Sequence, residues 1–175
     1  MNPRTRRVNV DQDRELLLEF HCIANYESET PWARKAPYAC YRAKWFGTPQ
    51  TSVFLSALKK SMEDQRTIAE IWETEDGTVA AYAWVTFTEI EGYGTVLAEV
   101  RDVAVKAEFR RQGIGTGIFR HIESLARKHG AVVLRSEVGI ENAVSQGLHK
   151  KYGFAPHRVG YEKVLDHAAV EASLG

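Results

Sequence analysis

The segment Arg110–Gly117, RRQGIGTG, has the residue types that bind phosphate groups. It lies where an apolar run ends and a helical pattern begins. The first N–H groups of a helix have no partner within it, and the helix dipole adds partial positive charge there. A phosphate suits that position: Gly113 and Gly115 leave the backbone accessible, while Arg110 and Arg111 add charge. The alternative is a flexible turn with a solvated basic flank.

The segment differs from two common phosphate-binding motifs. It lacks the lysine and Ser/Thr ending of a Walker loop. It also lacks the third glycine of the dinucleotide-binding fingerprint, and the strand before it closes a predicted antiparallel meander. It therefore belongs to neither of these classes.

A second stretch, NAVSQGLHKKYGF at 142–154, contains a histidine and a tyrosine, two side chains that can donate a proton to a ligand. In a helix, residues three or four positions apart lie on one face. The apolar stripe that we expect to face the core consists of Val144, Leu148 and Tyr152. The neighbouring polar stripe consists of Asn142, Ser145 and His149. We therefore expect Tyr152 to pack, with its hydroxyl bonded at the edge, and His149 to lie on the ligand side.

The elements that position these stretches follow from the hydropathy pattern. In the first third we expect a strand at 6–10, a helix from about residue 13, and a helix at 51–64 that Thr51 or Ser52 caps. Between Pro31 and Pro49 lies an irregular or partly helical connection rich in aromatic rings.

The rest of the chain alternates between strand and helix patterns. An antiparallel meander covers 67–105 and turns at Asp76-Gly77. The remaining elements are a helix at 114–130, a buried strand at 131–138, a helix at 142–153, and a final strand or hairpin at 154–165. This order predicts an α/β (α+β) fold with a mixed, mostly antiparallel central sheet and helices on both faces.

Composition narrows the classes of function. The 175 residues are 44% hydrophobic and 26% charged, and their formal net charge is zero, which argues against a nucleic-acid binder. No apolar run suits a signal sequence or a bilayer span, so we expect no membrane partner and a cytoplasmic location. Cys22 and Cys40 do not form a metal-type pair, so we expect free thiols and no metal site.

At this point the sequence resembles the GNAT family of N-acetyltransferases. The stretch VRDVAVKAEFRRQGIGTGIFRHI is similar to the central motif of that family, Arg/Gln-x-x-Gly-x-Gly/Ala, through Arg110, Gly113 and Gly115. The stretch ENAVSQGLHKKYGF is similar to its next motif. The specific match covers 98–165, and the first sixty or so residues match only in arrangement.

The resemblance implies acetyl-CoA as the cofactor. Its pyrophosphate would lie on the N–H groups of Gln112, Gly113, Ile114, Gly115 and Thr116. Its pantetheine arm would pair, like an extra strand, with the backbone of Val103, Ala104 and Val105. Asn142 would reach the pantetheine arm or act as a helix cap, and one side chain can do both.

The resemblance also implies acetyl transfer to a primary amine, which needs a base for the amine and an acid for the thiolate. Glu99 is the candidate base, directly or through water, and an ion pair with Arg101 is the alternative. Strand alternation places Asp102, the rival base, on the opposite face unless a bulge lies between them.

The residue at the position of the family's general acid differs from the family pattern. Where the family has a tyrosine, four positions before Gly153-Phe154, this chain has His149. A free imidazole loses its proton near neutral pH, whereas a phenol keeps its proton to about pH 10. We therefore leave two roles open for His149: proton donor to the thiolate, or a residue that only lines the site.

We expect one domain over 1–175, with acceptor-side helices in 1–66 and the sheet and acetyl-CoA-binding core in 67–165. The predicted reaction is direct attack by a small-molecule amine in a ternary complex. The alternatives are a protein or peptide N-acetyltransferase and a non-catalytic acyl-CoA sensor. The family also contains dimers, so a homodimer is a further expectation, and no residue set identifies the acceptor.

Overall fold

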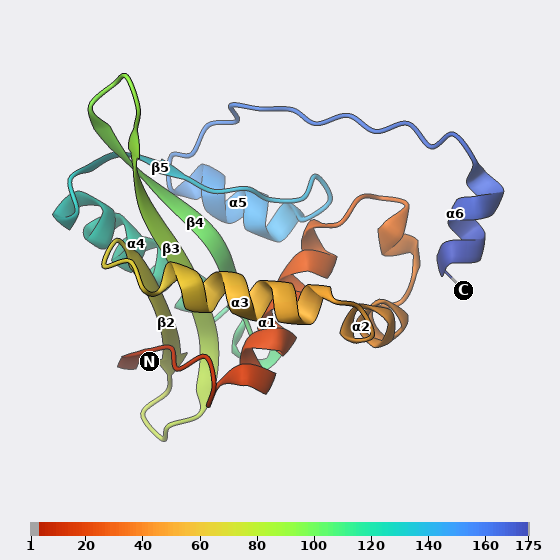
Figure 1. Cartoon of the computed structure of the whole chain (residues 1–175), viewed down its shortest axis with the longest axis horizontal. Coiled ribbons are helices and arrows are strands. Elements are labelled where there is room, and N and C mark those ends of the chain that lie inside the picture. The colour runs from red at the N-terminus through yellow and green to blue at the C-terminus, as the bar shows by residue number, and fades with distance from the viewer. Residues whose placement is uncertain (1–3, 175) are drawn as a thin grey trace.

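The computed structural model of the chain describes residues 4–174, and its frame is a five-stranded sheet (Figure 1). The spatial order of the strands follows the chain: β1 (Arg4–Arg7), β2 (Thr67–Glu73), β3 (Val79–Ile90), β4 (Thr95–Val105) and β5 (Ala131–Arg135). The first four strands pair antiparallel and β5 joins β4 in parallel. The predicted mixed, mostly antiparallel sheet is confirmed.

Helices cover both faces of the sheet, as expected. They are α1 (Arg14–Ser28), α2 (Tyr38–Phe46), α3 (Gln50–Ser61), α4 (Ile114–Lys128), α5 (Ala143–Lys151) and α6 (His167–Leu174), with 3₁₀ turns at Ala33–Lys35 and Ala107–Phe109. Side chains of α1, α2 and α3 form one core cluster with Tyr82 and Trp84 of β3. The apolar stripe of α4 forms the other with alternate residues of β3 and β4. This division follows from the two-residue period of a strand.

The start of α1 is fixed to the edge of the sheet by a buried carboxylate. Both terminal nitrogens of Arg6 lie 2.8 Å from the Asp13 carboxyl oxygens, and the Arg6 Nε lies 2.6 Å from Glu73 Oε1. The hydrogen bond from Arg6 holds the pKa of the Asp13 carboxyl below its usual value. The position of α1 over β4 therefore rests on a specific ion pair as well as on packing.

A β-bulge interrupts β4 in the middle. Val85 of β3 pairs with Val100 of β4. The next pair joins Trp84 to Asp102, so Arg101 is the extra residue. An extra residue shifts the alternation of every side chain that follows it. The exception that we allowed, a bulge between Glu99 and Asp102, is therefore present, and the two residues face the same side of the sheet.

The pairing of β4 with β5 is short. It runs from Val96–Ala131 to Glu99–Arg135, and β4 continues for six residues beyond it. Within residues 4–174 no strand pairs with this edge of β4 after Glu99. The two parallel strands therefore separate where the bulge begins.

Three expectations about individual elements are wrong. The helix predicted to be capped by Thr51 or Ser52 begins earlier, because Pro49 occupies the N-cap position. The strand at 131–138 ends at Arg135 and is not buried, since Val132 is 67% exposed.

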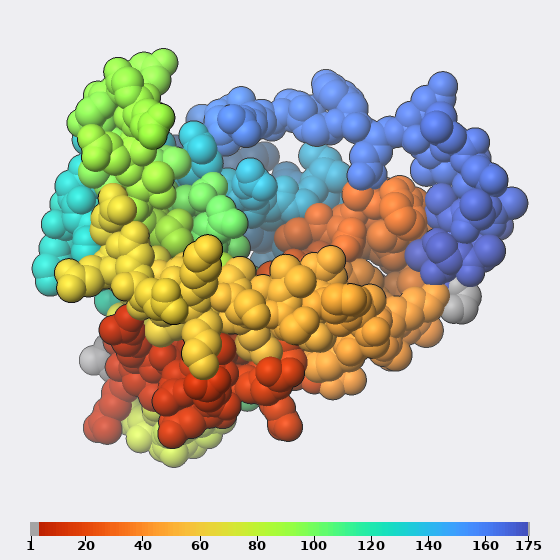
Figure 2. All heavy atoms as spheres, in the orientation of Figure 1, coloured from red at the N-terminus to blue at the C-terminus, as the bar shows by residue number. Residues whose placement is uncertain are grey.

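The segment predicted as a final strand or hairpin, 154–165, contains no strand in the part of the chain that the structure describes. It extends along the top of Figure 1 to α6, and gaps separate parts of it from the body in Figure 2. Its apolar positions Val159, Tyr161 and Leu165 are exposed. The strand pattern is present, but the segment has no strand partner within residues 4–174.

None of the described helices is long and apolar enough to cross a membrane.

Candidate active site

The turn before α4 presents backbone N–H groups to one side. Arg111 has φ +63° and Gly113 has φ +84°, both in the left-handed region. Gly113 is the N-cap of α4 and has no side chain, and no other side chain of residues 4–174 caps this helix. The N–H groups at the start of α4 therefore point away from the helix without a protein acceptor, which is the geometry that binds an anion.

Gly113 and Gly115 are favoured at their positions for two different physical reasons. A Cβ on Gly113 would meet no atom within 4 Å, so its left-handed backbone is what favours glycine. A Cβ on Gly115 would lie 3.3 Å from Leu148 Cδ2 of α5. The close approach of α4 and α5 thus accounts for Gly115 without a ligand.

The two arginines of the turn differ in their contacts with the rest of the protein. Arg110 Nη1 lies 2.7 Å from Glu27 Oε1 of α1, and Arg110 Nε donates to the Val105 carbonyl at 3.0 Å. Arg111 is exposed, and no hydrogen bond from it is found within residues 4–174. The Gln112 side chain donates to the Glu108 carbonyl at 2.8 Å. Arg110 therefore ties the turn to α1, while Arg111 is the cation available to a ligand.

The open edge of β4 leads toward this turn. It carries Val103, Ala104 and Val105, whose side chains alternate between the two cores. The loop after β5 approaches the C-terminus of α1 closely, since a Cβ on Gly139 would lie 2.7 Å from the Cα of Ser28. An extended ligand could pair with this edge as an added strand.

The bulge brings both candidate carboxylates to the α1 side of the sheet. Glu99 Oε2 lies 2.8 Å from Arg101 Nη1, and that guanidinium lies 5.9 Å from the centre of the Trp84 ring. This is the ion pair that we gave as the alternative to a base. Asp102 is buried and its Oδ2 lies 2.7 Å from His21 Nδ1.

His21 was not among the residues predicted from the sequence. A signal was present, because His21 follows the buried Leu17 by four positions and so lies on the buried face of its helix. A buried polar ring requires a hydrogen-bond partner. The sequence could not identify Asp102 as that partner, since no spacing in the sequence shows that α1 packs over the bulge in β4.

His149 is buried rather than lying on an open polar face. Its ring centre is 5.0 Å from that of Phe119 and 5.0 Å from that of Phe154. Its Nδ1 donates to the Ser145 carbonyl at 2.7 Å, and its Nε2 is buried without a partner in the described chain. A neutral ring with this tautomer carries a lone pair on Nε2 and cannot give a proton from it.

The other polar residues of α5 have structural contacts. The Asn142 side chain accepts from the Ser145 N–H at 3.0 Å, so it caps α5. The Tyr152 ring stacks on Phe119, and its hydroxyl donates to the Thr116 carbonyl at 2.9 Å, as expected of a packing residue. Val144 is 70% exposed, so the prediction that it faces the core is wrong.

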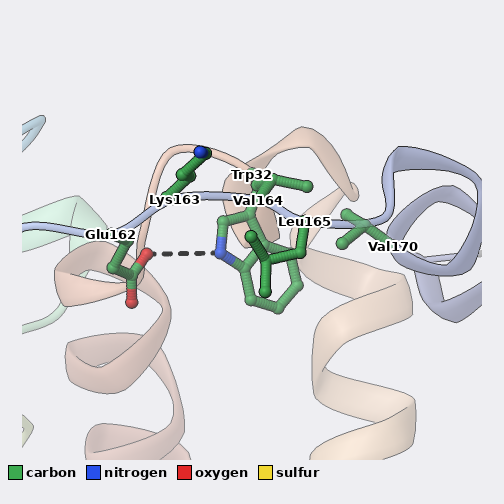
Figure 3. Close-up of a pocket in the computed structure, with 6 residues that line it drawn as sticks. All are labelled: Trp32, Glu162, Lys163, Val164, Leu165 and Val170. Carbon is green, nitrogen blue, oxygen red and sulfur yellow. Dashed lines mark hydrogen bonds between the residues drawn. The ribbon is translucent and has the colours of Figure 1, made fainter.

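A cavity of about 360 Å³ lies elsewhere, between Trp32 and the C-terminal segment (Figure 3). The Trp32 Nε1 donates to Glu162 Oε2 at 3.3 Å across it. None of its lining residues comes from β4, the turn or α5, so it is separate from the candidate site. No cluster of residues that could hold a metal ion occurs within 4–174.

The sequence model of the acetyltransferase (GNAT) family matches residues 24–154, and the chain belongs to this family. Among solved structures, the aminoglycoside antibiotic 6'-N-acetyltransferase of Acinetobacter baumannii is 18% identical, with a TM-score of 0.64 over 93% of this chain and 98% of that one. An acetyltransferase of Clostridium acetobutylicum, solved with acetyl-CoA, is 14% identical, with a TM-score of 0.67 over 94% and 97%. At these identities they establish the fold.

The names of two curated relatives refer to different amines. A putative [ribosomal protein bS18]-alanine N-acetyltransferase of Bacillus subtilis is 32% identical over 84 residues, which are 47% of this chain and 50% of that protein. An aminoglycoside N(6')-acetyltransferase type 1 of A. baumannii is 27% identical over 93 residues, 52% and 64% of the two chains. This chain thus spans between half and two thirds of the length of these relatives.

Proposed function

We propose that this protein is an acetyl-CoA-dependent N-acetyltransferase that transfers an acetyl group to a primary amine of a small molecule. Transfer would occur by direct attack within a ternary complex of protein, acetyl-CoA and amine. Two observations carry this proposal: the edge of β4 that has no strand partner after Glu99, and the N–H groups at the start of α4, the next helix in the chain, that no side chain caps. Family membership supports the same cofactor.

The proposed acetyl-CoA-binding site extends along the edge of β4 to the start of α4. The pantetheine arm would pair with the backbone of Val103, Ala104 and Val105, as an added strand pairs with a sheet edge. The pyrophosphate would accept hydrogen bonds from the first turn of α4, with Arg111 beside it. Asn142 already caps α5, and its remaining amide hydrogens could reach the arm.

The chemical step requires a neutral amine. Attack by the amine nitrogen on the thioester carbonyl forms the C–N bond, and the C–S bond then breaks to release the thiolate. Glu99 remains the base predicted from the sequence, although its pairing with Arg101 supports the ion-pair alternative. The tautomer of His149 supports its lining role rather than proton donation.

A second candidate acceptor is the N-terminal amine of a peptide. The match to the alanine N-acetyltransferase of B. subtilis has the highest sequence identity of the curated relatives described above and favours this candidate. The aminoglycoside relatives favour the small molecule. The two acceptors share a primary amine, so the reaction at the thioester is the same.

The test is turnover of acetyl-CoA with three acceptors: kanamycin, spermidine and a hexapeptide that begins with alanine. We expect release of free thiol with at least one of them, and acetyl-CoA should bind far more tightly than S-acetylpantetheine, which lacks the pyrophosphate. Binding without turnover would support the acyl-CoA sensor instead. Absence of both binding and turnover would refute the proposed function.

A further inference from the structure

The His21–Asp102 pair has the geometry of an oriented proton acceptor. His21 Nδ1 lies 2.7 Å from Asp102 Oδ2, and the Asp102 side chain is only 5% exposed. A carboxylate accepts hydrogen bonds, so the proton of a neutral imidazole is on Nδ1 and the lone pair is on Nε2. The buried carboxylate therefore selects the tautomer whose free nitrogen can take up a proton.

Two rings fix the direction in which that lone pair points. The Phe54 ring of α3 stacks on the His21 imidazole with centres 3.8 Å apart and planes at 6°. The Trp45 ring of α2 meets it edge-on at 5.8 Å. Together with the Asp102 hydrogen bond, these contacts hold the imidazole in one rotamer, which is the preorganisation that a general base needs.

The free nitrogen of His21 is accessible. Within residues 4–174, Nε2 makes no hydrogen bond and is not among the buried polar atoms that lack one. The indole N–H of Trp84 and the hydroxyl of Tyr82, on the same face, are both buried. By the same criterion the Trp45 Nε1 is also accessible, but an indole N–H only donates, so the accessible acceptor nitrogen of this aromatic cluster belongs to the histidine that a carboxylate orients.

The position of the pair within the fold connects it to the acyl group. Asp102 is the first residue after the bulge, on the stretch of β4 whose edge is open. His21 comes from α1, which lies along that stretch and pairs through Glu27 with the turn before α4. The pair thus lies on the acceptor side of the strand that would hold the thioester.

We propose that His21 takes the proton from the acceptor amine and that Asp102 is its positioning residue. This inference rests on the proposed function and assigns the base within it. It takes the base role from Glu99, whose carboxylate pairs with Arg101.

The protons balance as follows. Nε2 of neutral His21 takes one proton from the ammonium group of the acceptor and passes it to water. The neutral nitrogen then forms the C–N bond, and the C–S bond breaks. The second proton leaves the nitrogen and ends on the departing thiolate, so the products are the amide, free coenzyme A thiol and one released proton.

The groups that face His21 leave Asp102 as its direct ionic partner. From β3, Tyr82 faces Asp102, and burial together with the Asp102 charge raises the pKa of its hydroxyl well above the usual value, so it stays neutral. From α2 and α3 the facing groups are the uncharged rings of Trp45 and Phe54. The Glu99–Arg101 ion pair is the next charged group along β4.

The test compares His21→Asn with His121→Asn, using whichever of the three acceptors the wild-type protein acetylates. Asparagine keeps an amide N–H for Asp102 and removes the base. We expect His21→Asn to lower kcat by about 100-fold or more, the usual contribution of a general base, and to move the rise of kcat/KM with pH to the higher range in which the acceptor amine loses its own proton. In the wild-type protein the rise is expected at lower pH, because neutral His21 takes the proton from the ammonium group. His121→Asn should keep both kcat and the rise.

Acetyl-CoA affinity separates a lost base from a lost fold. An unchanged Kd for acetyl-CoA in His21→Asn with the expected loss of turnover supports the proposal, and His21→Gln is measured in the same way if the asparagine variant does not bind. A variant that binds acetyl-CoA and keeps the wild-type pH profile overturns the inference and leaves the proposed function intact. Failure of the wild-type protein to acetylate any acceptor overturns both.

Discussion

Two histidine–carboxylate pairs lie on opposite faces of the sheet. His21 and Asp102 join α1 to β4, and His121 and Glu70 join α4 to β2, each with a nitrogen–oxygen distance of 2.7 Å. The carboxylates differ: the Asp102 side chain is 5% exposed and the Glu70 side chain 22%. The nitrogen–oxygen distance alone therefore does not show which histidine–carboxylate pair is catalytic.

The strands beneath the two pairs explain the difference. β2 is paired on both sides, with β1 and β3, so its backbone has no free edge near Glu70. Asp102 lies on the part of β4 where one edge is open. The rings also differ, because Trp72 meets His121 edge-on at 5.4 Å whereas Phe54 stacks flat on His21. A pair beside an open edge can meet a ligand, and a pair between complete ladders stabilises the fold.

After the two histidine variants, the largest difference should come from the two carboxylates. Asp102→Asn should lower kcat by about tenfold to a hundredfold, because misplacing a reacting group by about 1 Å can cost as much. Glu70→Gln should change kcat by less than about twofold, since a partly exposed ion pair contributes only about 0–1 kcal/mol to stability. Steady-state kinetics of both variants measures this difference, and the affinity for acetyl-CoA checks that each variant is folded. Equal losses in the two variants would remove the distinction between the pairs.

His149 is a third histidine and is expected to respond differently from both pairs. It packs between two phenylalanine rings, so His149→Ala should lower the free energy of unfolding by about 2 kcal/mol or more through loss of buried contacts. Its kcat should fall by less than about tenfold. Denaturant unfolding and kinetics on the same preparation measure both. A large loss of kcat with unchanged stability would instead restore His149 as a proton donor.

A small effect on kcat is also expected for the base predicted from the sequence. Glu99→Gln breaks a partly exposed ion pair with Arg101, and kcat should fall by less than about tenfold. The comparison is with His21→Asn under identical conditions. A greater loss in Glu99→Gln than in His21→Asn would return the base role to Glu99.

Much of the fold could be predicted because its signals are local. The meander, the apolar stripe of α4 and the glycine turn each follow from periodicity and turn chemistry within a few residues. The turn itself was predictable, but the reason for Gly115 was not. Its closeness to Leu148 depends on how α5 packs on α4, which no spacing in the sequence specifies.

The candidate site was less predictable because it depends on contacts between distant elements. His21 and Asp102 are 81 residues apart, and their pairing needs both the bulge in β4 and the placement of α1. The stripe rule for α5 placed Tyr152 correctly and misjudged His149, because Phe119 and Phe154 cover a face that looked polar. A helical period shows which residues share a face and does not show what covers that face.

The extra residue in β4 determines which side of the sheet each later side chain of the strand faces. If Arg101 instead paired with Trp84, as in a regular ladder, Asp102 would lie opposite Ala83 and face α4, while Val103 would turn toward α1. That register would keep every residue of the proposed site and lose the pairing of His21. A slip of one residue in a strand can therefore separate two halves of an active centre whose sequence is unchanged.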